Sequence, residues 1–290
     1  MAGNSTGGSL IDDAKLKQLY ATMLRCRLLT ERARLLRKSK TLFDGSLGQE
    51  AIATGFAIDL RPEDTVVLAS HQSIASLVKG VALSDVAALL YERHNPAGCS
   101  TDHIIYAASS LPSDKGKLFQ AAGNVALANK RENKGNVVVV FSSVAATALD
   151  EWHQALRMAA RRSLPAIFVV ENNPWVEPAD ARARNGVKKL PFKTQMDGVT
   201  SITVDGNDVV AVYRVAYESL ERVRKGGGAV LIEAKPYRQH RQVLSNTERD
   251  PLTHMEQYLT AKKLFTPRWK NGIVQQFSQE LKTALRDLEA

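Results

Sequence analysis

The chain has 290 residues, of which 44% are hydrophobic and 24% are charged, as in a globular protein with a large buried core. Its net charge of +9 raises the question of an acidic partner. The basic residues have few aromatic residues among them and match no recognisable nucleic-acid module. The composition therefore disfavours specific nucleic-acid binding, and it leaves a solvated basic surface or contact with an acidic protein.

The two cysteines, Cys26 and Cys99, are not spaced like metal ligands, and reduced thiols fit a cytoplasmic protein. The first ten residues, MAGNSTGGSL, lack the apolar core of a signal peptide. No apolar run approaches the length that spans a bilayer. These features predict a soluble cytoplasmic protein that does not contact a membrane.

The first hundred residues predict helices around one strand. The apolar spacing favours a long amphipathic helix over Ile11–Lys40 and a shorter one over Gln49–Ile58. Thr65–Leu68 is typical of a buried strand, and Ser84 is a candidate N-cap for the next helix. Asn95–Lys117 shows no clear periodicity, which predicts an irregular loop.

The remaining chain alternates strands with helices. Strands are predicted over Val137–Val140, Ala166–Val170, Ile202–Val204 and Ala229–Glu233, helices over Leu118–Arg131, Ala145–Arg162, Asp208–Lys225 and Pro251–Ala290, and a loop over Pro174–Phe192. This alternation predicts an α/β fold, a doubly wound parallel sheet, in one domain that covers residues 1–290.

Polar residues follow two neighbouring buried strands of this sheet. The turn Ser142-Ser143-Val144 comes after the valine run, and Asn172-Asn173 comes after the next strand. Ligands in open α/β sheets bind where strands end at their carboxyl edge, so both segments are expected to face one crevice. The asparagines have a structural alternative, because Asn side chains also cap turns by bonding to their own backbone.

Several short motifs carry a resemblance by their order and spacing. They are Gly48-Gln49-Glu50-Ala51, Ala122-Gly123, Leu164-Pro165, Val204-Asp205-Gly206-Asn207-Asp208-Val209 and Leu231-Ile232-Glu233. With them the chain resembles the alpha subunit of the thiamin diphosphate-dependent, decarboxylating first component of 2-oxo acid dehydrogenase complexes. The resemblance implies a thiamin diphosphate-binding fold, thiamin diphosphate with magnesium as cofactors, and a beta-type partner subunit.

The departures from the family pattern fall on the metal site. Alignment back from Leu164-Pro165 without gaps places Ser143-Val144-Ala145 at the family's Gly-Asp-Gly motif. Val144 therefore replaces the metal-binding Asp, and the resemblance leaves Asn173 and the carbonyl of Trp175 as magnesium ligands. By the same comparison Ala145 and Ala146 would lie beside the diphosphate. Magnesium requires oxygen ligands, and an isopropyl group has none.

Other matched positions have changed too. His71 stands in the motif that supplies a phosphate-binding Arg in the family, and Leu111–Gly116 replaces a glycine-rich turn near the cofactor. The resemblance leaves His103 and His240 as candidate acid/base residues, while Gln242 stands where another His would lie. A lone His is otherwise more often a structural hydrogen-bonding residue.

Three hypotheses for the function follow. The first is an alpha-type dehydrogenase subunit whose degraded cofactor site binds weakly or not at all, so that activity is reduced or lost. The alternative is a pseudoenzyme that acts as a structural or regulatory partner of a beta-type subunit, or that self-associates. The third is a site adapted to another ligand and lined by Asn173, His103 and His240.

Overall fold

The computed structural model describes residues 11–36, 47–68, 74–90, 103–106, 112–172, 195–196, 198–236 and 250–289. These residues contain a seven-stranded sheet in the order β2-β1-β3-β4-β7-β6-β5. Neighbouring strands are parallel except β5 and β6, which pair antiparallel at one edge. The strands are β1 (Thr65–Leu68), β2 (Ile104–Tyr106), β3 (Val138–Ser143), β4 (Ala166–Glu171), β5 (Gln195–Met196), β6 (Val199–Asp205) and β7 (Val230–Lys235).

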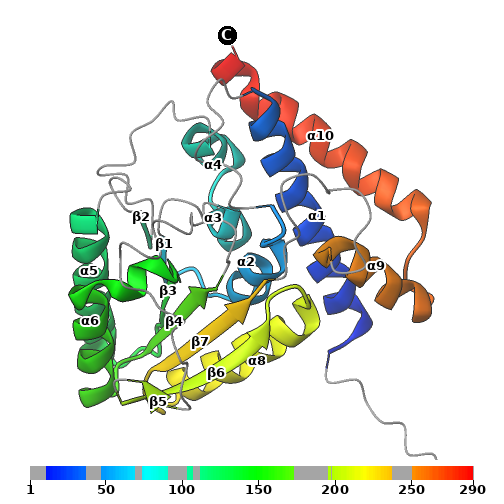
Figure 1. Cartoon of the computed structure of the whole chain (residues 1–290). Coiled ribbons are helices and arrows are strands. Elements are labelled where there is room, and N and C mark those ends of the chain that lie inside the picture. The colour runs from blue at the N-terminus through cyan, green and yellow to red at the C-terminus, as the bar shows by residue number, and fades with distance from the viewer. Residues whose placement is uncertain are drawn as a thin grey trace, which may run out of the picture.

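Helices cover both faces of the sheet, which confirms the predicted doubly wound α/β fold (Figure 1). One face packs against α5 (Pro112–Glu132) and α6 (Asp150–Arg161). The other packs against α2 (Glu50–Ala57), α3 (Ile74–Lys79) and α8 (Val209–Arg224). Outside this second layer lie α1 (Asp13–Leu36), α4 (Leu83–Leu90), α9 (Pro251–Ala261) and α10 (Pro267–Glu289).

The run of valines in β3 is explained by burial on both sides. Val138 and Val140 lie in the apolar cluster with α5 and α6, whereas Val139 and Phe141 lie in the cluster with α2 and α8. Successive side chains of a strand point to opposite faces, and both faces of a parallel sheet are covered by helices. The run therefore forms one central strand that is apolar throughout.

The expected loop at Asn95–Lys117 is wrong in two places. Residues 104–106 form β2, which pairs in parallel with β1, and α5 begins at Pro112 rather than at Leu118. Three residues are too few for a periodic signal. Proline suits the first turn of a helix, because its missing N–H would have no partner there. The replacement of the glycine-rich turn is therefore helical from Pro112 on.

Two other boundaries differ from the predictions. Ser84 is not an N-cap: α4 begins at Leu83, and the carbonyl of Ala82 accepts hydrogen bonds from the N–H groups of Asp85 and Val86. The helix expected after Pro251 is two helices, which are separated where Lys263 has a positive φ of 59°. A single residue in this conformation ends a helix, and the local sequence gave no glycine to mark it.

No helix within the described ranges is long and apolar enough to cross a membrane. Cys26 is a free thiol buried against the face of the sheet that α2 covers. Burial raises the pKa of the Cys26 thiol to about 12, and the negative charge of Glu50 adds to the rise. The reduced, buried thiol expected at this position is confirmed.

Candidate functional site

The candidate site lies where the strands end at their carboxyl edge. Ser143 at the end of β3 is in register with Glu171 at the end of β4, and Glu171 is in register with Ala234 of β7. The residues that follow, Val144 and Asn172, therefore leave the sheet side by side. The shared edge is as predicted, although Ser142 and Ser143 belong to β3 and are not part of a turn.

Val144 begins the turn after β3, but it belongs to the hydrophobic core. Its side chain is 6% exposed and lies in the apolar cluster with Trp152 and residues of α5 and β4. Its carbonyl accepts hydrogen bonds from the backbone N–H and the hydroxyl of Thr147, at 3.1 and 2.6 Å. The isopropyl group has no oxygen to offer, and two donors already use the carbonyl.

Ala145 and Ala146 lie in a short 3-10 helix, η1 (Ala145–Ala148), between β3 and α6. The expected helix Ala145–Arg162 is therefore interrupted, because Leu149 has extended backbone angles of φ −83° and ψ 135°. Ala146 is buried and Ala145 is partly exposed. By the resemblance, Ala145 adds a methyl group where the family motif has its second glycine.

The other end of the same edge is polar and its groups are paired. Glu233 of β7 is 2% exposed. One of its oxygens accepts a hydrogen bond of 2.6 Å from the side-chain amide of Asn172. The other accepts from the hydroxyl of Thr203 at 3.0 Å and lies 3.0 Å from the ammonium of Lys235. Glu233 therefore joins the ends of β4, β6 and β7.

Asn172 consequently has a structural role in the described residues. Its backbone N–H donates to the carbonyl of Ala234 at 2.9 Å, and its amide is used by Glu233. The amide of Asn172 bonds to the side chain of a neighbouring strand and not to the backbone of its own turn, which the structural alternative had expected. The sequence signal for Glu233 was its position at the end of the apolar strand Val230–Lys235, where a carboxylate needs partners.

The motif Val204–Val209 closes the edge beside β7. Asp208 caps α8, because its carboxylate accepts from the N–H groups of Val210 and Ala211 at 2.9 and 3.1 Å. A Cβ atom on Gly206 would lie 2.9 Å from both the Ile52 side chain and the backbone nitrogen of Pro236. The glycine thus permits close contact between this turn, α2 and the end of β7.

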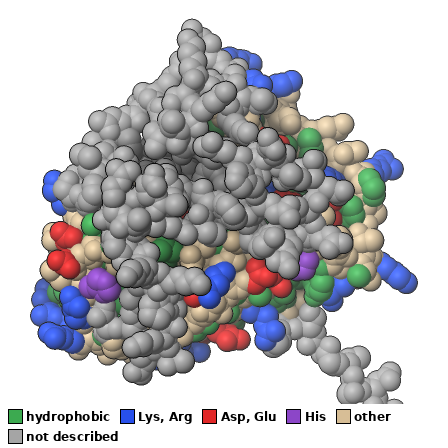
Figure 2. All heavy atoms as spheres, viewed as in Figure 1, with side chains coloured by type: hydrophobic (Ala, Val, Ile, Leu, Met, Phe, Trp, Pro, Cys, Tyr) green, Lys and Arg blue, Asp and Glu red, His purple; other side chains and the backbone are tan. Residues whose placement is uncertain are grey.

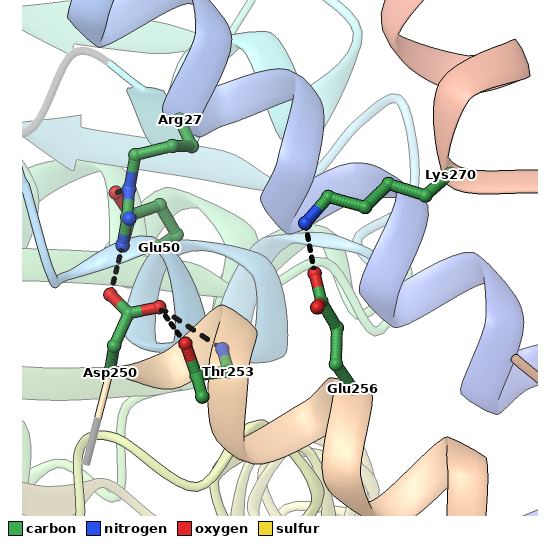
Figure 3. Close-up of polar contacts among 6 residues, drawn as sticks. All are labelled: Arg27, Glu50, Asp250, Thr253, Glu256 and Lys270. Carbon is green, nitrogen blue, oxygen red and sulfur yellow. Dashed lines mark hydrogen bonds and ion pairs between the residues drawn. The ribbon is translucent and has the colours of Figure 1, made fainter. Parts of the chain in front are cut away.

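The motif at Gly48–Ala51 contains the start of α2, in agreement with the helix predicted over Gln49–Ile58. Glu50 begins α2, is fully buried, and receives the forked guanidinium of Arg27 at 2.6 and 3.1 Å (Figure 3). The same guanidinium donates to Asp250 at 2.7 Å, and Asp250 caps α9 through the backbone N–H of Thr253. The carboxylates raise the pKa of Arg27 despite its burial. This ionic cluster joins α1, α2 and α9.

The structure does not bring His103 to the carboxyl edge. The residue is exposed, has a φ of 65°, and precedes β2, where its carbonyl accepts from the N–H of Val66. Because β2 runs parallel to β1, this position is the amino-terminal end of the strand. His71, His240, Asn173 and Trp175 lie outside the described residues.

The described residues do not fit a magnesium diphosphate at the end of β3. No group of three His, Cys, Asp or Glu side chains within them could hold a metal ion. Val144 is apolar and buried where the resemblance places the carboxylate ligand, and Glu233 is already paired with Asn172, Thr203 and Lys235. A divalent cation needs several hard oxygen ligands, which this part of the edge does not supply.

Comparison with known proteins gives the family. The family described as "Dehydrogenase E1 component" matches residues 20–289. The pyruvate dehydrogenase E1 component subunit alpha of Staphylococcus epidermidis is 25% identical over 297 residues, which cover 96% of this chain and 79% of the relative. The protein of the same name from Bacillus subtilis is 25% identical over 300 residues, with 97% and 79% covered. The chain therefore belongs to the dehydrogenase E1 component family.

Proposed function

We propose that the protein is an alpha-type subunit that assembles with a beta-type chain, and that its own site binds magnesium and thiamin diphosphate weakly or not at all. Its similarity to E1 subunits alpha covers nearly the whole chain, which supports the first part. The apolar end of β3 supports the second. Decarboxylation of 2-oxo acids by this chain is accordingly reduced or lost.

The observation that carries the proposal is the burial of Val144. In the family the residue at this position is an Asp that holds magnesium against the diphosphate, and here the side chain packs into the core. A carboxylate in contact with a dication in a partly dry site contributes on the order of 3 kcal/mol, which is roughly a hundredfold in affinity. Magnesium would have to be held by diphosphate, water and uncharged groups.

Isothermal titration of the native chain with magnesium and thiamin diphosphate tests the proposal. We expect no saturable heat at cofactor concentrations of about 100 μM, since the loss of a hundredfold moves low-micromolar binding beyond that range. A dissociation constant in the low micromolar range would overturn the proposal. It would show instead a divergent enzyme whose metal ligands come from other groups.

A series of variants gives the matched comparison. Val144→Asp alone should recover little binding, because neighbouring positions also depart from the family pattern. The combination with Ser143→Gly, Ala145→Gly and His71→Arg should bind measurably better than Val144→Asp. Full recovery by Val144→Asp alone would mean that the site is otherwise intact.

A divergent but active enzyme is the second candidate, and the polar end of the edge favours it. Glu233, Asn172 and Thr203 hold the strand ends in place, so the frame around the site is preserved. Release of carbon dioxide from a 2-oxo acid by the chain mixed with a beta-type chain would support this candidate. We expect no release above the level of the beta-type chain alone.

Association is the remaining part of the proposal. The family buries apolar helix faces between subunits, and we expect this chain to form a dimer or a heterotetramer with a beta-type chain. Light scattering at micromolar concentration tests the expectation. A monodisperse monomer, alone and with the beta-type chain, would contradict it.

A further inference from the structure

The amino-terminal edge of the sheet, opposite the candidate site, collects the ends of three helices. Crossover helices run antiparallel to the strands they join, so α5, α6 and α8 end at this edge. Their last turns and the residues that follow are rich in basic side chains. These are Lys130, Arg131 and Lys134 at the end of α5, Arg161 and Arg162 at the end of α6, and Arg222, Arg224 and Lys225 at the end of α8.

Contacts between the helix ends make this a continuous surface. The ammonium of Lys130 donates to the carbonyls of Arg162 and Ser163 at 2.5 and 3.4 Å, which holds the ends of α5 and α6 together. A Cβ atom on Gly228, which follows α8, would lie 3.6 Å from the Cβ of Ser163. Arg224 donates to the carbonyl of Gly135 at 2.8 Å. The basic residues therefore stand on one connected end of the molecule.

The carboxylates at this end are largely used by their own neighbours. Asp64 is fully buried and pairs with Arg224, Glu132 pairs with Lys134, and Glu221 pairs with Lys225. Glu63 lies near Lys79. Arg131, Arg161 and Arg162 are exposed, and none of them forms an ion pair with another described residue. Lys and Arg side chains also gather over α5 and α6 in Figure 2.

We propose that this basic end, centred on Arg131, Arg161 and Arg162, is a docking surface for an acidic segment of a partner protein. A guanidinium binds a carboxylate through two parallel hydrogen bonds, and it is less strongly hydrated than an ammonium. Three such groups on two helices held together by Lys130 form a preorganised site for successive Asp or Glu side chains. The chain's net charge of +9 adds long-range attraction.

Two simpler explanations account for less of the pattern. Basic residues near a helix C-terminus are stabilised by the helix dipole, but each interaction contributes only about 0.3–1 kcal/mol and falls off beyond the last turn. Nucleic-acid binding explains the surface less well. The basic residues lie at the C-terminal ends of α5 and α6, so neither helix presents a basic side that could lie along a nucleic-acid groove. Aromatic side chains for base stacking are also absent beside these arginines in the described residues.

The position of the surface has a functional consequence. Val144 and Glu233 lie at the carboxyl edge, at the other ends of the strands. An acidic segment bound at the amino-terminal edge would leave the carboxyl edge accessible to a beta-type chain. The inference is independent of cofactor binding, so the two proposals can fail separately.

The test uses the full chain and a fluorescent poly-L-glutamate of about 20 residues at low ionic strength, where such attraction is least screened. Binding is measured by anisotropy for the native chain and for Arg131→Glu/Arg161→Glu/Arg162→Glu. The control, Arg268→Glu/Lys282→Glu/Arg286→Glu on α10, changes the net charge equally on exposed residues far from this end.

We expect binding that weakens with salt, at least a tenfold loss for the arginine triple variant, and no more than a twofold loss for the control. Circular dichroism checks folding, and Arg131→Gln/Arg161→Gln/Arg162→Gln replaces the first variant if it does not fold. Absence of native binding, or equal losses in both variants, would overturn the inference. Tighter binding of a DNA duplex that depends on the same arginines would also overturn it, by assigning the surface to nucleic acid.

Discussion

The ends of β3 and β7 lie on the same carboxyl edge of the sheet and differ in character. At the end of β3 the chain places Val144 in an apolar cluster, and its backbone carbonyl is used within the turn. At the end of β7 the buried carboxylate of Glu233 has partners from three strands. One end carries an apolar side chain that packs into the core, while the other carries a paired polar network.

The difference separates the requirements of folding from those of ligand binding. Glu233 is itself buried, and its carboxylate is held by hydrogen bonds from Asn172 and Thr203, so it stabilises the strand ends whether or not a ligand binds. A metal-binding carboxylate destabilises the fold when no metal is bound, because an isolated buried charge is unfavourable. A chain under selection for stability and association alone would keep the first group and replace the second. The proposal of a weak cofactor site accounts in this way for the difference between the ends of β3 and β7.

The largest effect is expected for Glu233→Ala. The substitution removes the charged acceptor of the half-buried Asn172 amide and of the exposed Thr203 hydroxyl, so the free energy of unfolding should fall by about 2–3 kcal/mol, most of it from Asn172. Urea denaturation measures it. Lys235→Ala is the control, because that ammonium is largely exposed and should change stability by less than about 1 kcal/mol. Similar small losses for both variants would mean that the network does not hold the edge together.

Val144→Asp should destabilise the fold without restoring the metal site. A carboxyl group in this apolar cluster lacks a designed partner, and the expected loss in the free energy of unfolding is about 2 kcal/mol. Burial should raise the pKa of the new Asp, so the loss should be larger at pH 8 than at pH 5, whereas Val144→Asn should show no such dependence.

Magnesium binding by Val144→Asp would be the result contrary to this expectation. A ligand that binds the folded state raises its melting temperature. If magnesium with pyrophosphate raises the melting temperature of Val144→Asp, but not that of Val144→Asn, the end of β3 still contains a usable metal site. We expect neither variant to respond.

How far the sequence predicts this edge depends on the kind of signal. The run of valines and the alternation of elements predicted the parallel sheet, because burial on both faces leaves a clear apolar pattern. The position of Val144 followed from alignment on Leu164-Pro165. By contrast, β2 has only three residues, which is too short for a periodic pattern. The helix break at Leu149 depends on its extended backbone angles, and no glycine or proline there indicates it.

The polar network was missed for a related reason. The partners of Glu233 come from residues that are far apart in the chain, such as Asn172 and Thr203, and they meet only through the strand order β4-β7-β6. A single sequence shows a buried acidic residue in an apolar strand but not its partners. The same reasoning explains why His103 was grouped with the site: the motif carried no information on which end of β2 it occupies.

Gly206→Ala tests how tightly the polar end is packed. The added methyl group would meet Ile52 and the backbone at Pro236 at about 2.9 Å, so the turn or the end of β7 must shift. We expect a loss of about 1–2 kcal/mol in the free energy of unfolding. Gly226→Ala is an informative comparison, because its Cβ would meet nothing and its cost arises from a φ of +80° alone. A neutral Gly206→Ala would show that the turn can move freely.

Titration of Cys26 tests whether water is excluded from the sheet face that α2 covers. Its pKa is raised to about 12 in the folded protein from an ordinary value of 9.0. The thiol of the unfolded chain ionises at a lower pH than the buried thiol. The free energy of unfolding is therefore highest below about pH 9 and falls as the pH rises towards 12. The free energy of unfolding should fall by about 1.4 kcal/mol per pH unit in this window. Cys26→Ala should remove this slope between pH 9 and 10, and an unchanged slope would assign it to other groups.

The smallest effect is expected for Ala145→Gly, which also tests the apolar end most directly. Ala145 is partly exposed in η1, so the substitution removes one methyl group and increases the freedom of the unfolded backbone, at a cost of about 0.5–1 kcal/mol. Ala148→Gly, which is exposed in the same short helix, should cost the same. A cost for Ala145→Gly well above that of Ala148→Gly would mean that the methyl group of Ala145 packs in the turn, and that the apolar end extends beyond Val144 into the position beside which a diphosphate would lie.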